Sequence, residues 1–306
     1  MDIISIIVPC YNEEESIGYF YKEIKQIEEE LENAKLELIF IDDGSKDNTY
    51  KKLCELHEVD KQVKCISFSR NFGKEAAIFS GLRAGEGDCF VVMDADLQHP
   101  PKTIIEMYSY WKQGYEVVEG IKKSRGKESG LHKWFASVFY DMISSVTHID
   151  MRNSSDFKLM DKRVVSELCS LTEKHTFFRA LAYWVGFKSA VVSYEVGERV
   201  AGKSKWSFWK LTKYAIKNLT SFTNAPLQII TILGLVFLFI GVVLGIDAVV
   251  SFVRGMAVEG YPTLLLLIII STGSIMISLG IIGVYISKIY DEIKNRPQYI
   301  IRDSKK

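Results

Sequence analysis

Two long apolar runs near the C-terminus constrain the fold of this chain most. Residues 227–246 and 264–286 contain no Asp, Glu, Lys or Arg. A helix of about 20 such residues crosses the roughly 30 Å hydrocarbon layer of a membrane. The sequence therefore predicts two transmembrane helices, at about 227–250 and 264–286, within a membrane region 226–288.

Basic residues flank this region on its two outer sides. They are Lys205, Lys210, Lys213 and Lys217 before it, and Lys288, Lys294 and Arg296 after it. Because an excess of Lys and Arg stays in the cytoplasm, both termini are expected there. The prediction is a multi-pass protein of the cell membrane, with a hairpin followed by a cytoplasmic tail, 289–306.

The segment just before the hairpin has two faces at helical spacing. Lysines occupy one face, and the other carries Phe208, Leu211, Ala215, Leu219 and Phe222. This pattern favours an amphipathic helix lying in the membrane interface, residues 205–225. A core helix of the soluble domain is the alternative.

The first 204 residues have the pattern of a soluble α/β domain. Strands are expected at 3–8, 36–41, 63–68, 89–93 and 117–120, and helices at 14–33, 49–57, 74–84 and 101–113. Pro9 is expected to end the first strand, because proline has no N–H. Strands alternating with helices across short links indicate a mainly parallel sheet covered on both faces.

Polar clusters follow these strands, at the sheet edge where ligands of such folds gather. The clusters are Pro9, Tyr11 and Glu13; Asp42 and Asp43; Arg70, Asn71 and Lys74; and Asp94, Asp96 and Gln98. The chain has neither GxGxxG after its first strand nor GxxxxGK[ST]. The usual dinucleotide fingerprint and the phosphate-loop NTPases are therefore not favoured.

The stretch CFVVMDADLQHPP, residues 89–101, is the strongest chemical signal. If the backbone stays extended, Asp94, Asp96 and Gln98 point to one side. Two carboxylates and an amide oxygen there suit Mg²⁺ or Mn²⁺, which also binds substrate phosphates. The alternative is a strand end with an aspartate cap for the next helix.

Composition narrows the function classes. The chain has 38 basic and 38 acidic residues, which gives no support for nucleic-acid binding. Its five cysteines have no CxxC spacing, as is typical of a reducing compartment. The N-terminus lacks a basic segment and a long apolar run, so we expect no signal peptide and a cytoplasmic catalytic part.

Two further segments carry candidate residues. Gly120 to Lys133 is a stretch rich in glycine and basic residues that is either a solvated loop, or a mobile lid or anion-binding loop near the membrane. Arg199, Lys203 and Lys205 surround a glycine and favour phosphate recognition, with a solvated loop as the alternative. Asp156 lies between small polar residues and an apolar run.

Five motifs in this order, VPCYNEEES, IDDGSKDNT, RNFGKEAA, DADLQHPP and ERVAGKSKW, resemble the family 2 glycosyltransferases. More narrowly, they resemble enzymes that glycosylate polyprenyl phosphates, such as dolichyl or undecaprenyl phosphate. The resemblance runs from about residue 3 to the C-terminus. It implies a type A, Rossmann-like nucleotide-diphosphosugar transferase fold and an inverting, metal-dependent reaction.

The resemblance also implies roles for individual residues. Base, ribose and sugar diphosphate would be held by Pro9, Tyr11, Glu13, Asp42, Lys74, Asp94 and Ala95. The divalent metal would be held by Asp94, Asp96 and Gln98. Catalytic roles fall on Asp156, Arg199 and Lys205, and the acceptor phosphate would meet Arg125 and Lys205. The QxxRW and Thr-Glu-Asp motifs of processive synthases are absent, which favours a single transfer.

The predicted function is transfer of one sugar, from a UDP-sugar in preference, to polyprenyl phosphate on the cytoplasmic face. Cleaving the donor builds charge on the leaving phosphate, which a metal stabilises. Two alternatives stay open: a glycerolipid hydroxyl as acceptor, and a membrane scaffold that only binds nucleotide. Small residues at Gly273, Ser274, Gly280 and Gly283 permit close helix packing and a homo-oligomer.

Overall fold

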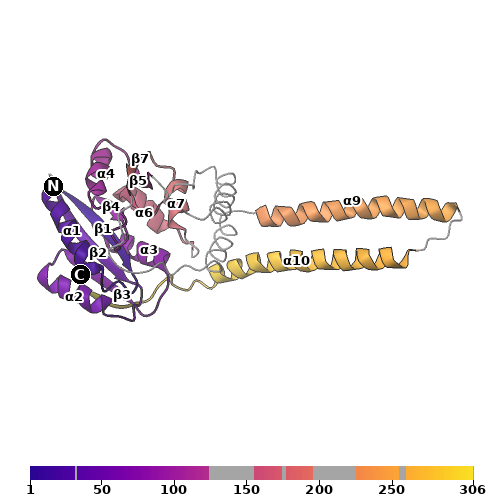
Figure 1. Ribbon diagram of the computed structural model, residues 1–306, viewed down its shortest axis with the longest axis horizontal. Coiled ribbons are helices and arrows are strands. Elements are labelled where there is room, and N and C mark those ends of the chain that lie inside the picture. The colour runs from indigo at the N-terminus through magenta and orange to yellow at the C-terminus, as the bar shows by residue number, and fades with distance from the viewer. Residues whose placement is uncertain (32, 124–154, 174–176, 196–224, 255–259, 306) are drawn as a thin grey trace. The chain divides into compact units, whose positions relative to one another are not determined.

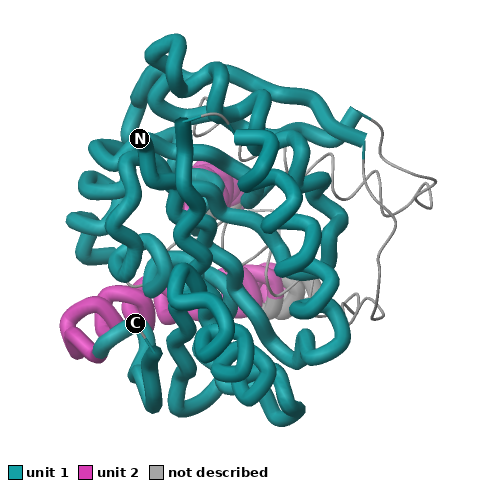
Figure 2. Tube along the Cα trace, turned by 90° about the vertical axis from the view of Figure 1, so that its left-hand side faces the viewer, with its two compact units in different colours: residues 1–210, 297–306 teal, residues 211–296 magenta. Residues whose placement is uncertain are grey.

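The computed structural model describes residues 1–31, 33–123, 155–173, 177–195, 225–254 and 260–305. The chain divides into two compact units. The first comprises Met1–Lys210 with Pro297–Lys306, and the second comprises Leu211–Arg296 (Figure 2). Each unit is described by itself.

One eight-stranded sheet organises the first unit, in the order β7-β5-β6-β4-β1-β2-β3-β8 (Figure 1). Its strands are β1 (Asp2–Cys10), β2 (Ala34–Asp42), β3 (Val63–Phe68), β4 (Cys89–Val92), β5 (Val117–Lys122), β6 (Lys158–Asp161), β7 (Ser189–Tyr194) and β8 (Ile301–Lys305). Its helices are α1 (Ile17–Glu30), α2 (Thr49–Val59), α3 (Lys74–Ala84), α4 (Thr103–Lys112), α6 (Lys162–Ser170) and α7 (Phe178–Trp184).

The centre of the sheet is parallel, as predicted. Strand β1 pairs in parallel with β2 and β4, and β2 pairs in parallel with β3. Strands β6 and β8 run antiparallel to their neighbours. The predicted α/β fold with a mainly parallel sheet is confirmed.

Alternation along β1 sends its side chains to two apolar layers. Ile4, Ile6 and Val8 join the core formed with α1, α2 and α4. Ile7 faces the other way, toward α3, and a Cβ on Gly81 of α3 would lie 2.3 Å from the Ile7 Cγ2. Glycine at position 81 therefore permits the close packing of α3 on the sheet.

The first strand continues through Pro9 to Cys10, so the expectation that Pro9 ends it is wrong. The Ile7 carbonyl faces β4 and accepts the Met93 N–H at 3.1 Å. Two residues on, Pro9 faces the same side, but the pairing with β4 has already ended at Val92. The missing N–H of Pro9 therefore costs no ladder hydrogen bond, and pairing with β2 continues to Cys10.

The end of the predicted tail forms part of the sheet. The predicted tail began at residue 289, whereas α10 continues to Ile293 and Ile301–Lys305 form β8. Strand β8 pairs antiparallel with the outer edge of β3. All five β8 residues are exposed. Their sequence, IRDSK, lacks the alternation of apolar and polar residues by which strands are predicted.

The second unit contains two long helices, α9 (Ala225–Val253) and α10 (Tyr261–Ile293). With 29 and 33 residues, they extend about 44 and 50 Å at 1.5 Å per residue. Windows at Leu227–Leu244 and Ile270–Ile293 have mean hydropathies of 2.8 and 1.7, and neither is buried. Both helices are long and apolar enough to cross a membrane. Residues 205–224 of the predicted interfacial helix lie outside the described residues.

Candidate functional site

Two loops at the carboxyl edge of the sheet are locked together. The Asn12 N–H donates to the Ser45 hydroxyl, and the Lys46 N–H donates back to the Asn12 side chain, both at 2.9 Å. The Glu13 N–H donates to the Thr49 hydroxyl at 2.9 Å. These bonds hold the predicted residues Tyr11 and Glu13 at the edge, and Tyr11 is exposed.

Asp42 is the last residue of β2, Asp43 follows it, and both are buried. Asp42 accepts the Ser45 N–H at 2.9 Å and the Ser67 hydroxyl at 2.7 Å. Asp42 thus stabilises the loop that follows β2. Its contact with a nucleotide base stays a prediction. Asp43 accepts the N–H groups of Phe72 and Gly73 at 2.6 and 2.9 Å, which fixes the start of α3.

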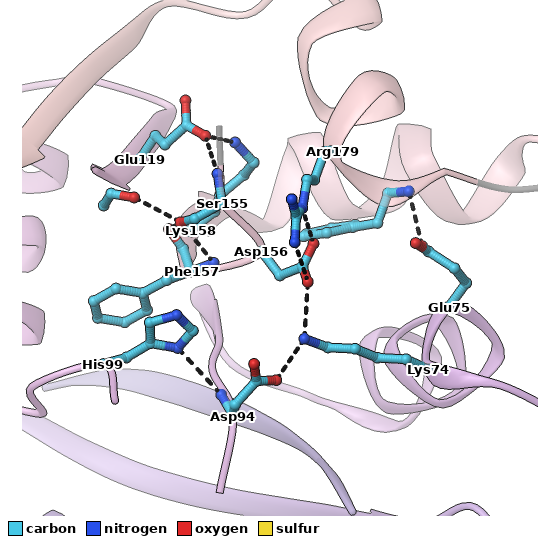
Figure 3. Close-up of polar contacts among 12 residues, drawn as sticks. Lys74, Glu75, Asp94, His99, Glu119, Ser155, Asp156, Phe157, Lys158 and Arg179 are labelled. Atoms are coloured by element: carbon cyan, nitrogen blue, oxygen red, sulfur yellow. Dashed lines mark hydrogen bonds and ion pairs between the residues drawn. The ribbon is translucent and has the colours of Figure 1, made fainter. Parts of the chain in front are cut away.

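A charge network follows from that placement of α3 (Figure 3). Lys74, the first residue of α3, lies 2.6 Å from an Asp94 oxygen and 2.8 Å from an Asp156 oxygen. Arg179 of α7 donates to both oxygens of Asp156, from Nε at 2.6 Å and Nη2 at 3.0 Å. Four segments far apart in the sequence therefore meet through two cations and two carboxylates.

The cations keep both carboxylates ionised. Burial opposes ionisation of Asp156, but Lys74 and Arg179 outweigh it and hold the pKa of this carboxyl far below its usual range. Burial likewise opposes ionisation of Asp94, and Lys74 outweighs it, so the pKa of Asp94 is also lowered. At neutral pH the site presents fixed negative charge, balanced by Lys74 and Arg179.

The segment after β4 is a turn, so the expectation of an extended backbone there is wrong. The strand ends at Val92, and Leu97 has a φ of +59°. The Asp96 carboxylate accepts the Gln98 N–H at 3.1 Å and stabilises the turn. Ala95 is buried, whereas Asp94, Asp96 and Gln98 are half-buried. In the described part of the chain, no three His, Cys, Asp or Glu side chains are grouped to hold a metal.

His99 contacts both this turn and the segment just before β6, which carries Asp156 and Phe157. Its ring stacks on Phe157 with centroids 4.9 Å apart, and its Nδ1 lies 3.4 Å from the Asp94 N–H. Burial lowers the pKa of His99, so the ring is neutral at pH 7 and Nδ1 can accept that hydrogen bond. These contacts give His99 a packing role beside the site.

Sequence reasoning missed Arg179 and Glu75. Glu75 accepts the Phe178 N–H at 2.8 Å, so consecutive residues of α3 hold Asp156 and the start of α7. Desolvation, with the nearby charge of Asp156, raises the pKa of Glu75 to about 7. Glu75 lies inside the RNFGKEAA motif, which could have suggested it, but no local signal marks Arg179. The predicted Arg125, Arg199 and Lys205 lie outside the described residues.

The mainly parallel sheet with an acidic site at its carboxyl edge agrees with the nucleotide-diphosphosugar transferase fold of type A that the resemblance implies. Residues 5–169, more than half of the chain, match the family described as "Glycosyl transferase family 2". The chain belongs to this family and is a glycosyltransferase.

Several relatives are similar over nearly the whole chain. The "Prophage bactoprenol glucosyl transferase homolog" of Escherichia coli is 38% identical and covers 99% of both chains. The "Bactoprenol glucosyl transferase" of Shigella phage SfV is also 38% identical, again over 99% of both. The "Uncharacterized glycosyltransferase YkcC" of Bacillus subtilis is 39% identical over 98% of this chain and 93% of its own length.

Solved structures show weaker similarity. Glucosyl-3-phosphoglycerate synthase from Mycobacterium tuberculosis, in complex with Mn²⁺, UDP and phosphoglyceric acid, is 19% identical, with a TM-score of 0.48 over 70% of this chain and 75% of that one. The mannosyltransferase PcManGT from Pyrobaculum calidifontis, in complex with GDP-Man and Mn²⁺, is 15% identical, with a TM-score of 0.43 over 90% and 86% of the two chains.

Proposed function

We propose that this enzyme transfers a single sugar, with inversion, from a nucleotide diphosphosugar to polyprenyl phosphate at the cytoplasmic face of the cell membrane. The observation that carries the proposal is the pairing of an ionised carboxylate site with two membrane-length helices in one chain. The names of the bactoprenol glucosyl transferases, which are similar over the full length, support a polyprenyl acceptor. A UDP-sugar is the favoured donor.

The donor site is formed by the loops that follow β1, β2 and β4. Tyr11 and Glu13 would meet the base and ribose, together with Pro9 near the end of β1 and Asp42 at the end of β2. Ala95 and the Asp94 carboxylate would lie beside the sugar diphosphate. Lys74, which bridges Asp94 and Asp156, would contribute positive charge next to that diphosphate.

Asp94, Asp96 and Gln98 fit a divalent metal. The lowered pKa of Asp94 keeps its carboxylate charged, and Mg²⁺ usually takes one or two carboxylates and completes its shell with substrate phosphates and water. Mg²⁺ or Mn²⁺ bound there would supply Lewis-acid stabilisation of the leaving nucleotide diphosphate. The two aspartates would hold it through carboxylate oxygens, and Gln98 through its amide oxygen.

Asp156 acts as an orienting group in this proposal. Its two oxygens already accept bonds from Lys74 and Arg179, and its lowered pKa makes it a weak base. A lipid phosphate is largely ionised at pH 7 and needs no strong base, whereas a hydroxyl acceptor does. The site therefore suits a phosphate acceptor better than a glycerolipid hydroxyl.

The membrane helices give the acceptor its location. Removing a prenyl tail from the bilayer costs about 0.8 kcal/mol per CH₂, so the enzyme has to work where the lipid phosphate lies. Arg199 and Lys205, as catalytic cations, and Arg125, on the acceptor side, remain our proposed contacts for that phosphate. A homo-oligomer packed through small residues of α10 also remains a proposal.

The test is sugar transfer by the full-length protein in membranes. Labelled UDP-glucose and other nucleotide sugars are supplied with undecaprenyl phosphate or with diacylglycerol. An acid-labile lipid product that forms only with undecaprenyl phosphate, stops with EDTA and returns with Mg²⁺ or Mn²⁺ is the expected result. Asp94→Asn and Asp96→Asn should each lower the rate at least about 10²-fold.

Three results would contradict parts of the proposal. Product formed from diacylglycerol alone assigns the enzyme to a hydroxyl acceptor. Full activity in EDTA contradicts the proposed need for a divalent metal. Biological activity that survives both Asp94→Ala and Asp96→Ala indicates a scaffold that binds nucleotide without catalysis.

A further inference from the structure

The strand β8 lies beside β3, which carries Ser67, a hydrogen-bond partner of Asp42. Its backbone pairs with β3 from Cys65 to Phe68, and the Ser69 N–H donates to the Ile300 carbonyl at 2.9 Å. The Tyr299 ring stacks on Phe68 with centroids 4.9 Å apart and an interplanar angle of 11°. The segment that follows α10 is thus an integral part of the catalytic unit.

The pairing of β8 with β3 shifts register at one position. Ser67 pairs with Asp303, but the next residue, Phe68, pairs with Ile301. Arg302 is therefore left opposite no residue of β3, as in a β-bulge. Bulges of this kind re-aim a side chain and are frequent next to active sites.

The re-aimed side chain joins a hydrogen-bonded chain that ends on Asp42. Arg302 donates from Nη2 to the Ser67 hydroxyl at 3.0 Å, and this hydroxyl donates to the Asp42 carboxylate at 2.7 Å. The other Asp42 oxygen accepts the Ser45 N–H at 2.9 Å. Donors and acceptors agree at each step, so the direction of the chain is unambiguous.

This hydrogen-bonded chain places the positive charge of Arg302 near two buried carboxylates. Asp42 and Asp43 are 0% and 3% exposed, and adjacent buried carboxylates repel each other unless hydrogen bonds and cations compensate them. The guanidinium of Arg302 stays charged at any physiological pH. It lies one hydroxyl away from Asp42 and polarises that hydroxyl toward the carboxylate.

We infer that Arg302 is a positioning residue for donor binding, which acts through Ser67 on Asp42, so that the chain after the membrane hairpin completes the nucleotide site. The inference rests on the proposed function, in which Asp42 meets the base or ribose. Loss of Arg302 should weaken nucleotide binding and raise the donor KM. The kcat should change little, because three strands separate β8 from β4, which precedes Asp94.

The experiment uses full-length protein in detergent, with UDP and Mg²⁺ as the probe in isothermal titration calorimetry, or GDP if the wild type binds that diphosphate instead. Arg302→Gln should weaken binding about fivefold or more. Arg302→Lys should recover part of the affinity, because it restores the charge. Lys305→Gln, which removes a cation from the same strand, should stay within about twofold of wild type.

A double-mutant cycle with Ser67→Ala separates positioning from general loss of structure. In the Ser67→Ala background, Arg302→Gln should change UDP affinity less than twofold. An equal effect of Arg302→Gln in both backgrounds overturns the inference, and so does wild-type affinity in Arg302→Gln. If Arg302→Gln does not fold, unchanged UDP affinity in Ser67→Ala overturns it instead.

The same protein preparations distinguish this inference from the proposed function. A wild type that binds UDP but glycosylates no lipid phosphate contradicts the proposed acceptor, and the affinity comparison for Arg302 still stands. A wild type that glycosylates the lipid while Arg302→Gln keeps its donor KM contradicts the inference alone.

Discussion

Asp156 binds two cations that belong to different helices, Lys74 of α3 and Arg179 of α7. Arg179 donates one hydrogen bond to each oxygen of Asp156, and Lys74 forms ion pairs with both Asp156 and Asp94. Two parallel hydrogen bonds from a guanidinium fix the plane of a carboxylate, which a single ammonium group cannot do. Arg179 thus sets the orientation of Asp156, and Lys74 couples it to the proposed metal site.

Arg179→Gln is expected to lower kcat about tenfold or more and leave the donor KM within about twofold. Tenfold corresponds to about 1.4 kcal/mol, which is close to the worth of one charge-assisted hydrogen bond. Steady-state transfer kinetics measure both constants. Arg163→Gln, at an exposed cation of α6, is the control and should leave both unchanged. A raised donor KM with normal kcat would place Arg179 on the donor instead.

Glu75 predicts a pH-dependent stability. Its pKa of about 7 in the folded protein lies above the value of about 4.3 in an unfolded chain. Stability from the protonated form is thus fully present below about pH 4.3 and lost as the pH rises through 7. The charges around Glu75 are Asp156, Lys74 and Arg179.

Glu75→Gln keeps an acceptor for the Phe178 N–H and removes the titration. We expect its thermal unfolding midpoint, relative to wild type, to be higher at pH 8 than at pH 5. Glu23→Gln, at an exposed residue of α1, should show no such trend. A constant difference between Glu75→Gln and wild type across this range would contradict the assigned pKa.

At the scale of elements, the loop after β2 determines where α3 begins. Asp43 caps the chain at Phe72 and Gly73, while Gly44, at a φ of +66°, lies against the backbone of Arg70. A Cβ on Gly44 would be 2.4 Å from the Arg70 carbonyl carbon. The loop must therefore carry glycine for α3 to present Lys74 and Glu75 to the site.

Gly44→Ala should destabilise the fold by more than the left-handed strain alone, which is about 1–2 kcal/mol. It should also lower transfer, because the start of α3 moves. Gly114→Ala is the matched control, since Gly114 has a φ of +87° with nothing within 4 Å of the added Cβ. Equal losses of unfolding midpoint in the two variants would show that contact with Arg70 is unimportant.

At the scale of the whole molecule, the two apolar runs, 227–246 and 264–286, and the basic residues on their outer sides predict a hairpin with both ends in the cytoplasm. Glu259, between the helices, should then face the outside. A membrane-impermeant maleimide should label Glu259→Cys in intact cells, on a background with the five native cysteines replaced by serine. Lys306→Cys should be labelled only after permeabilisation. Labelling of Glu259→Cys only after permeabilisation would reverse the predicted orientation.

The sequence by itself determined the strands of the central sheet, the acidic residues at their ends and the two membrane-length helices. These features depend on local pattern: apolar runs set the strands and helices, and the parallel order brings Asp42, Lys74 and Asp94 to one edge. Family motifs added the role of Asp156, which no periodicity indicates.

Only the tertiary structure decided which charges meet. Arg179 lies on a short helix far along the chain from Lys74, and Arg302 lies on an exposed strand without alternation, so neither has a local signal. Pro9 is tolerated within β1 only because β4 ends before it, and the turn at Asp96 replaces the extended backbone that alternation implied. The turn is stabilised locally by the bond from the Gln98 N–H to Asp96. The charge contacts and the place of Pro9 depend on segments distant in sequence, which local periodicity and propensity do not encode.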